Sequence, residues 1–89
     1  MNHRYFWWDD LNIEHIADHG VEPYEAEEVM DNKPLILRAG KDKYLAYGQT
    51  DTGRYLLVVF ALKENDRLRV ITARDMTQTE KGRLRDRKR

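Results

Sequence analysis

Basic side chains are the residues of this sequence best suited to chemistry, because arginine and lysine can bind an anionic group such as a phosphate. Residues 32–89 contain 15 basic and seven acidic residues, whereas residues 1–31 contain one basic and nine acidic residues. The resulting net charges of +8 and −8 cancel over the chain and predict one basic and one acidic face. The basic face could contact nucleic acid. Alternatively, the charges lie on solvated surfaces that mix in three dimensions.

Arg74 is the strongest candidate for a phosphate-binding residue. Its planar guanidinium stays charged and can hold two phosphate oxygens at once. It ends a predicted strand just before a predicted helix, so the alternative is an ion pair with Asp75 or Glu80 that fastens the strand to the helix. Other candidate phosphate contacts lie in or beside predicted turns or on the same strand as Arg74: Lys41, Lys43, Arg54, Arg67 and Arg69. For any one of the first three taken alone, turn solvation is the better explanation, and the last two could instead protect an edge strand from aggregation.

Candidates for proton transfer are His19, Tyr44 and Glu80. Histidine is the commonest acid–base group near neutral pH, but His19 also suits the C-terminal end of a helix. Tyr44, like Tyr47, could donate a proton, stack on a base, or simply pack in a half-buried strand. Glu80 could act as a base or complete a helix capping box with Thr77. The sequence leaves these alternatives open.

Metal and cofactor chemistry has little support in the sequence. His15 and His19 are spaced to share one helix face, but no third ligand follows at a useful spacing. Cysteine is absent, which removes disulfides, thiolate metal sites and cysteine nucleophiles together. We therefore expect no metal and no cofactor.

The elements that must position these residues begin with two helices in a single small domain covering residues 1–89. Residues 5–8 are apolar and predict a short strand or an anchor. Apolar spacing predicts a helix over residues 10–18, capped by Asp9 and ended by Gly20. Pro23 is well placed to begin a second helix.

Strands and a last helix follow. Apolar runs predict strands at residues 35–37, 44–48, 55–62 and 67–74, separated by short turns. The Thr77–Glu80 pattern predicts a C-terminal helix, whose basic tail at residues 81–89 could fray, bind RNA or be ordered by an acidic partner. The expected class is α+β: an antiparallel meander of about four strands with two N-terminal helices and one C-terminal helix.

No part of the sequence suggests a membrane protein. The longest apolar run, residues 55–62, is too short to span a bilayer. Residues 1–4 are not followed by the apolar segment of a secretory signal. We expect a cytoplasmic protein with no membrane partner.

Short motifs spread over nearly the whole chain form a distinctive order and spacing. They are Phe6-Trp7-Trp8-Asp9, His19-Gly20-Val21, Glu25-Ala26, Glu28-Val29, Gly53–Val59, Arg67–Arg74, and Thr77 with Glu80. Together they resemble the BrnT-type toxins of bacterial toxin–antitoxin pairs, which are small ribonucleases with a RelE-like fold. The resemblance also points to Arg74. It implies RNA cleavage that inhibits translation, and a cognate antitoxin that binds over the active face.

Departures from the family pattern keep a second function open. Asp18 stands where the family usually has a lysine, Tyr44 stands where an arginine is common, and Leu84 stands where a tyrosine is common. The alternative is a noncatalytic RNA- or protein-binding module on the same fold. A DNA-binding regulator is a weaker alternative, because no helix-turn-helix pattern is visible.

Overall fold

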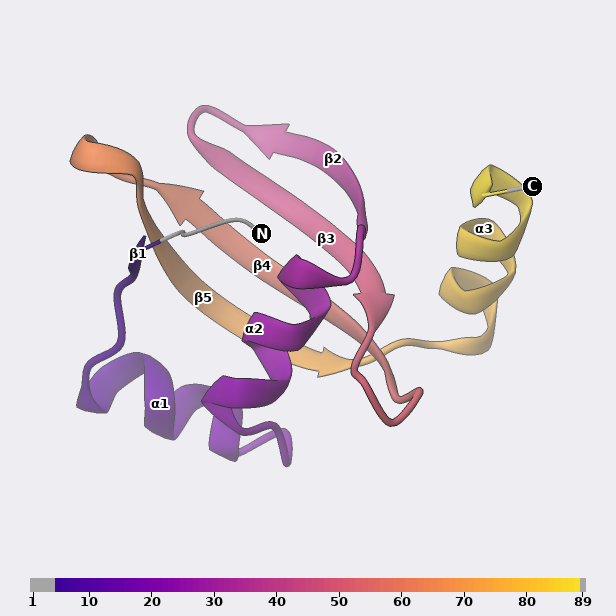
Figure 1. The fold of residues 1–89 in the computed structure, drawn as a ribbon, viewed down its shortest axis with the longest axis horizontal. Helices are drawn as coiled ribbons and strands as arrows, with labels where there is room; N and C mark the ends of the chain where they lie inside the picture. The colour runs from indigo at the N-terminus through magenta and orange to yellow at the C-terminus, as the bar shows by residue number, and fades with distance from the viewer. Residues whose placement is uncertain (1–4, 89) are drawn as a thin grey trace.

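The computed structural model describes residues 5–88 and contains three helices and a five-stranded sheet. Figure 1 shows these elements, which are β1 (Tyr5–Phe6), α1 (Asp10–Ala17), α2 (Pro23–Asp31), β2 (Leu35–Gly40), β3 (Lys43–Gln49), β4 (Tyr55–Leu62), a 3₁₀ turn (Glu64–Asp66), β5 (Arg67–Asp75) and α3 (Gln78–Lys88). The strand order across the sheet is β1-β5-β4-β3-β2. The α+β class, with two helices before the main strands and one after, is confirmed.

The sheet corrects the expected four-stranded antiparallel meander. Strands β2 to β5 do form an antiparallel meander, but β1 adds a fifth strand parallel to β5. Tyr5 pairs with Arg67 and Phe6 with Leu68, and the Trp7 amide continues the ladder by donating to the Leu68 carbonyl at 2.8 Å. The short strand or anchor expected at residues 5–8 is thus a strand at Tyr5–Phe6. Its place in the sheet was not predicted, because it pairs with the free edge of a strand some 60 positions away.

Local signals explain where the first two helices begin and end. The Asp9 carboxylate accepts from the Asn12 amide at 3.1 Å, and the Asn12 side chain accepts from the Asp9 amide at 2.8 Å. Gly20 takes a left-handed φ of 71°, which ends the first helical segment at little cost. Pro23 is the first residue of α2. The predicted roles of Asp9, Gly20 and Pro23 are therefore confirmed.

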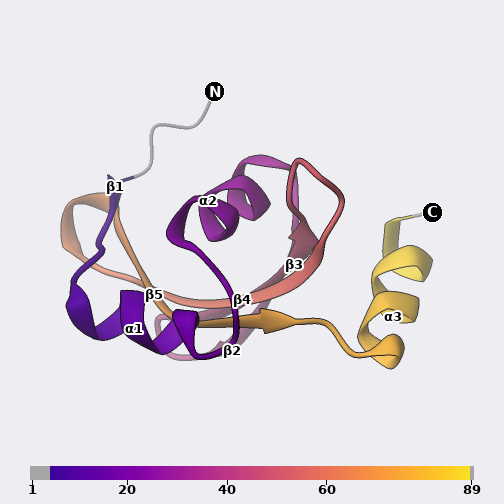
Figure 2. The ribbon, with the colours of Figure 1, turned by 90° about the horizontal axis from the view of Figure 1, so that it is seen from below.

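The hydrophobic core lies between α1, α2 and one face of the sheet. Figure 2 shows α2 lying over this face. Ile16 and Val29 from the helices meet Val58, Phe60 and other strand residues, all at most 2% exposed. At Gly48 a Cβ would lie 3.2 Å from both Pro34 and Val29, which is a tight contact, so glycine suits the close packing of α2 on β3. This layer supplies most of the apolar burial that stabilises the fold.

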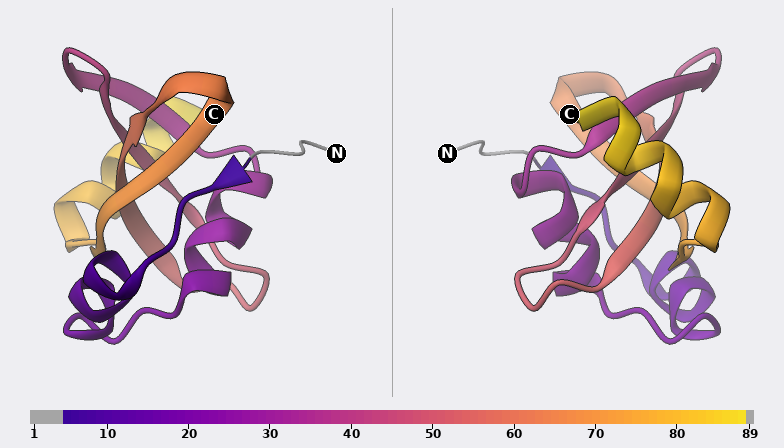
Figure 3. Two further views of the ribbon diagram at one scale, coloured as in Figure 1. Left: turned by 90° about the vertical axis from the view of Figure 1, so that its left-hand side faces the viewer. Right: turned by 90° about the vertical axis from the view of Figure 1, so that its right-hand side faces the viewer.

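The opposite face of the sheet is covered only in part. Helix α3 packs over β2 and β3 at one end, and Figure 3 shows it on a different side of the sheet from α1 and α2. Leu84, 5% exposed, is the buried apolar residue of this helix. Residues 81–88 of the basic tail continue α3, and Arg89 lies outside the described residues. Within residues 5–88 no helix is long and apolar enough to cross a membrane.

Candidate functional site

Arg74 and Tyr47 lie in one row across the sheet face that carries α3. The strand register pairs Arg74 with Leu57, Leu57 with Tyr47, and Tyr47 with Leu35. Directly paired residues point to the same side of a sheet, so these four side chains share one face. Leu57 is only 5% exposed, and Arg74 and Tyr47 therefore flank a buried leucine.

Arg74 forms a two-pronged ion pair with Glu80. Its Nη1 and Nη2 donate to Glu80 Oε1 and Oε2, each at 2.9 Å. Nη1 also donates to the Asp75 carbonyl at 3.0 Å. The ion pair with Glu80 that the sequence offered as an alternative role for Arg74 is thus present. The Arg74 side chain is still 39% exposed, so a ligand can reach it.

Glu80 also caps α3. Its Oε1 accepts from the Thr77 amide at 2.9 Å, and Thr77 Oγ1 accepts from the Glu80 amide at 3.2 Å, which confirms the predicted capping box. Hydrogen bonds from Arg74, and then from the Thr77 amide, lower the pKa of Glu80 to about 2 against the opposing effect of burial. The same pair raises the pKa of Arg74. A carboxylate held in this way is a weak base, and its first role is to orient Arg74.

A cleft of about 340 Å³ opens beside this pair, between α3 and the β2–β3 hairpin. Tyr47 and Glu80 both line it, so the Arg74 pair stands at its edge. The other lining residues are three leucines and two arginines: Leu35, Leu37, Leu84, Arg83 and Arg87. An apolar cleft with an aromatic ring and cationic groups at its rim can accept a small, partly apolar anion.

Tyr44 and His19 do not join Arg74. Tyr44 lies on the face that packs on α1 and α2, where its ring stacks on Phe60 with centroids 5.4 Å apart. His19 follows the end of α1, with its ring 5.8 Å from that of His15. Their predicted roles in proton transfer therefore gain no support from their positions. Within the described chain, no group of three or more His, Asp or Glu side chains could hold a metal ion.

Tyr47 is the tyrosine of β3 that faces the cleft, although the sequence favoured Tyr44. The two residues are three positions apart, and an odd spacing on a strand places side chains on opposite faces. The small residues Ala46 and Gly48 are buried, which marks the even-numbered positions of β3 as the core side. That alternation is the signal from which the site role of Tyr47 could have been predicted.

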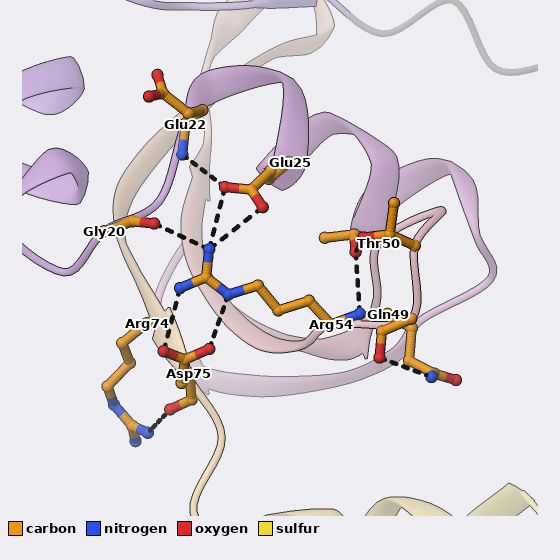
Figure 4. A network of polar contacts seen from close by, with 10 residues as sticks. Gly20, Glu22, Glu25, Gln49, Thr50, Arg54, Arg74 and Asp75 are labelled. Carbon is orange, nitrogen blue, oxygen red and sulfur yellow. Dashed lines mark hydrogen bonds and ion pairs between the residues drawn. The ribbon is translucent and has the colours of Figure 1, made fainter.

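Arg54 is enclosed by partners from three parts of the chain, as Figure 4 shows. Nε and Nη2 donate to the Asp75 carboxylate at 2.8 and 3.1 Å, and Nη1 donates to the Gly20 carbonyl at 2.8 Å and to Glu25 at 3.1 Å. These contacts raise the pKa of Arg54, first through Asp75. A guanidinium with all of its nitrogens engaged favours a structural role over a phosphate contact. Asp75 in turn presents its carbonyl to Arg74.

The remaining predicted phosphate contacts lie toward the other end of the strands. Lys43 pairs with Ala61 and Ala61 pairs with Arg69, so Lys43 and Arg69 lie on the same sheet face as Arg74. Arg69 is about 15 Å from Arg74 along β5. Arg69 is engaged by Asp9 at 2.7 Å, and Arg67 lies over the Trp7 ring at 4.1 Å. The exposed Lys41 lies in the β2–β3 turn.

The acidic segment (residues 1–31) and the basic segment (residues 32–89) are partly paired with each other in the folded protein. The ion pairs Arg54–Glu25 and Arg69–Asp9 join the two parts. Arg83 and Arg87 form no ion pair within residues 5–88 and keep their positive charge on the α3 side of the molecule. Positive charge without an ion-pair partner in the described residues is therefore present on α3.

Comparisons with known proteins agree with this architecture. Residues 7–80 match the family model described as "Ribonuclease toxin, BrnT, of type II toxin-antitoxin system". The structure is similar to the crystal structure of the Brucella abortus ribonuclease toxin BrnT, with a TM-score of 0.69 and 22% identity over 84% of this chain and 99% of that one. At this identity the likeness shows the fold alone. A search of curated protein sequences gave no match. Because the family model covers most of the chain, including Arg74 and Glu80, the protein belongs to the BrnT family of ribonuclease toxins.

Proposed function

We propose that this protein is the RelE-like toxin of a type II toxin–antitoxin pair, a metal-independent endoribonuclease that acts in the cytoplasm and inhibits translation by cleaving RNA. A cognate antitoxin neutralises it. The observation that carries the proposal is Arg74, which Glu80 orients beside an open cleft on the sparsely covered face of the sheet. Family membership supports the same function.

Arg74 has the chemistry that RNA cleavage needs most. In the reaction the 2′ oxygen bonds to the adjacent phosphorus while the bond from phosphorus to the 5′ oxygen breaks. The 2′ oxygen loses a proton and the 5′ oxygen gains one. Negative charge grows on the non-bridging oxygens, and a fork of N–H donors aimed at them stabilises the transition state. Arg74 presents such a fork, now filled by the carboxylate of Glu80.

The basicity of Glu80 increases when a phosphate replaces its carboxylate as the partner of Arg74. Its pKa is near 2 chiefly because Arg74 donates to it. A phosphate that accepts the same N–H groups removes that stabilisation, and the pKa of Glu80 then rises toward its ordinary value. A carboxylate beside the bound phosphate becomes a better acceptor for the 2′ proton. Glu80 therefore serves as an anchor for Arg74 in the free protein and as a base in the complex.

Neutralisation by an antitoxin follows from the same surface. Arg74 and the cationic side chains of α3 form the exposed basic side of the molecule. A partner with acidic groups that covers this side excludes RNA from Arg74 without any change of fold. Its binding free energy then competes directly with that of RNA.

A noncatalytic RNA- or protein-binding module on the same fold is the second candidate function. It is favoured by the mutual pairing of Arg74 and Glu80 and by the distant positions of His19 and Tyr44. In that case the basic side would hold RNA without cleaving it.

Cleavage of a long structured RNA by the purified, partner-free protein in EDTA tests the first candidate. Arg74→Ala is compared with Arg38→Ala, which also removes one exposed arginine but from the opposite face, where Arg38 pairs with Tyr44. We expect defined fragments from the wild type and from Arg38→Ala, and a cleavage rate about 10²–10³-fold lower for Arg74→Ala. Thermal unfolding of each variant establishes that folding is matched.

Intact RNA with well-folded wild type, with and without added ribosomes, would overturn the proposed cleavage. Retention of RNA in that experiment, lost as salt is raised, would support the binding module instead. Equal cleavage by wild type and Arg74→Ala would leave a ribonuclease but remove Arg74 from its centre.

A further inference from the structure

The cleft between α3 and the β2–β3 hairpin has the composition of a nucleotide-binding site. Leu35 and Leu37, alternate residues of β2, lie on the same face of the strand, and together with Leu84 from α3 they line the cleft. Tyr47 adds an aromatic ring to these apolar side chains. Every nucleobase has a π-face that stacks on such a ring, whatever the base.

Positive charge lies at the rim of the cleft. Arg83 and Arg87 are four residues apart in α3, so they share one helix face about 6 Å apart. Both are exposed, and neither forms an ion pair within residues 5–88. The acidic lining residue Glu80 is already neutralised by Arg74. The cleft therefore offers two uncompensated cations to an anion.

The cleft adjoins the position proposed for the reacting phosphate. The lining residues of α3 are spaced three or four positions apart, so they lie along one side of the helix. Arg87 is seven residues after Glu80 and therefore lies about 10 Å from it along the helix axis. A single strand of RNA with one phosphate on Arg74 can place its neighbouring nucleotide between α3 and Tyr47.

We propose that this cleft binds one unpaired nucleotide of the RNA, next to the phosphate held by Arg74. The base stacks on Tyr47 among the leucines, and the adjoining phosphate contacts Arg83 and Arg87. The inference rests on the proposed function for the identity of the ligand, and it makes Tyr47 a binding residue. The volume of about 340 Å³ suits one nucleotide better than a helix of a protein partner, which is about 10 Å wide.

Binding of a short single-stranded RNA with 2′-O-methyl groups tests the site without cleavage, because the attacking 2′ hydroxyl is blocked. Fluorescence anisotropy compares wild type, Tyr47→Phe, Tyr47→Ala and Arg87→Gln, with Arg38→Gln as the matched control on the opposite face. We expect Tyr47→Phe and Arg38→Gln to bind within about twofold of wild type. Tyr47→Ala should bind about 10-fold more weakly, within the range for loss of one base stack.

Arg87→Gln keeps the test valid if Tyr47→Ala fails to fold, because Arg87 is exposed. Its affinity should fall, and the slope of log affinity against log salt should decrease by about 0.7, the value for one phosphate contact with a single strand. The control should lower neither quantity.

Oligonucleotides that lack one base at successive positions locate the stacked nucleotide. With wild type, one abasic position should weaken binding about 10-fold, and with Tyr47→Ala the same abasic position should have no further effect. Unchanged affinity in folded Tyr47→Ala and in Arg87→Gln would overturn the site. Failure of cleavage with these binding results intact would reject the proposed ribonuclease activity but not the nucleotide site. An acidic peptide gives a further comparison. If the peptide binds, needs Tyr47 and Arg87, and is displaced by neither RNA nor single nucleotides, the cleft is a protein-binding site instead.

Discussion

The two faces of the sheet are built in opposite ways. On one face, α1 and α2 bury a continuous apolar layer in which Ile16, Val29 and Phe60 are at most 2% exposed. On the other face, α3 covers one end of the sheet and buries Leu84, while its remaining side chains are mostly charged. Arg74 and Glu80 meet on this second face, at its boundary with solvent. Stability is concentrated on the first face and candidate chemistry on the second.

The contrast has an energetic basis. Burial of apolar surface contributes about 25 cal/mol per Å², so the layer between the helices and the sheet dominates the free energy of folding. Ion pairs that remain partly exposed contribute about 0–1 kcal/mol each. Side chains on the α3 face can therefore be arranged for a ligand with little loss of stability, which is the situation in which a binding site is expected.

Truncating one buried apolar side chain on each face tests this contrast with the largest expected effect. Phe60→Ala leaves a cavity in the main core and should lower the free energy of unfolding by about 3–5 kcal/mol. Leu84→Ala removes the apolar anchor of α3 and should cost about 2 kcal/mol, because the rest of that helix buries little. Urea unfolding followed by tryptophan fluorescence measures both. Equal losses would mean that α3 is as much a part of the core as α1 and α2.

The Arg74–Glu80 pair should show an intermediate effect that depends on pH. Because the folded pKa of Glu80 is about 2, below its ordinary value of 4.5, its contribution is fully present above pH 4.5 and is lost as pH falls toward 2. The free energy of unfolding of Glu80→Gln should therefore be about 1 kcal/mol lower than that of wild type at pH 7. The difference should shrink steadily between pH 4.5 and 2.

Urea unfolding of both proteins at several pH values from 7 to 2 makes this measurement. The pKa values of Asp9 and Asp75 are also lowered, chiefly by hydrogen bonds from Arg69 and Arg54, but these residues are unchanged in the variant and cancel in the difference. A difference that stays constant with pH would contradict the assigned pairing.

Gly82 allows the smallest and most local test. It lies inside α3, and a Cβ at this position would meet no atom within 4 Å. Gly82→Ala should raise the free energy of unfolding by about 0.5–1 kcal/mol, because alanine loses less conformational freedom than glycine in a helix. Hydrogen exchange should show slower exchange in α3 and no change in α1. Faster exchange in α3 would show that the glycine is needed for its geometry.

Local signals in the sequence determined much of this molecule. Asp9, Gly20 and Pro23 predict the limits of the first two helices because capping, left-handed φ and a fixed proline φ act within a few residues. The continuous apolar run at residues 55–62 predicts β4 with its observed limits. Thr77 and Glu80 predict the start of α3 for the same local reason.

Tertiary structure decided which of the candidate side chains meet. The parallel pairing of β1 with β5, the enclosure of Arg54 by Glu25 and Asp75, and the separation of His19 from Arg74 all depend on contacts between segments distant in the sequence. The choice between Tyr44 and Tyr47 depends on which face of β3 the helices cover. By itself the sequence predicted most of the elements, because helix caps and strand periodicity are local properties, and it identified Arg74 and Glu80 as candidate site residues. The position and lining of the cleft were determined only by the packed sheet. Strand register, and the face of the sheet on which each helix packs, are fixed only when the strands pair and the helices pack on them.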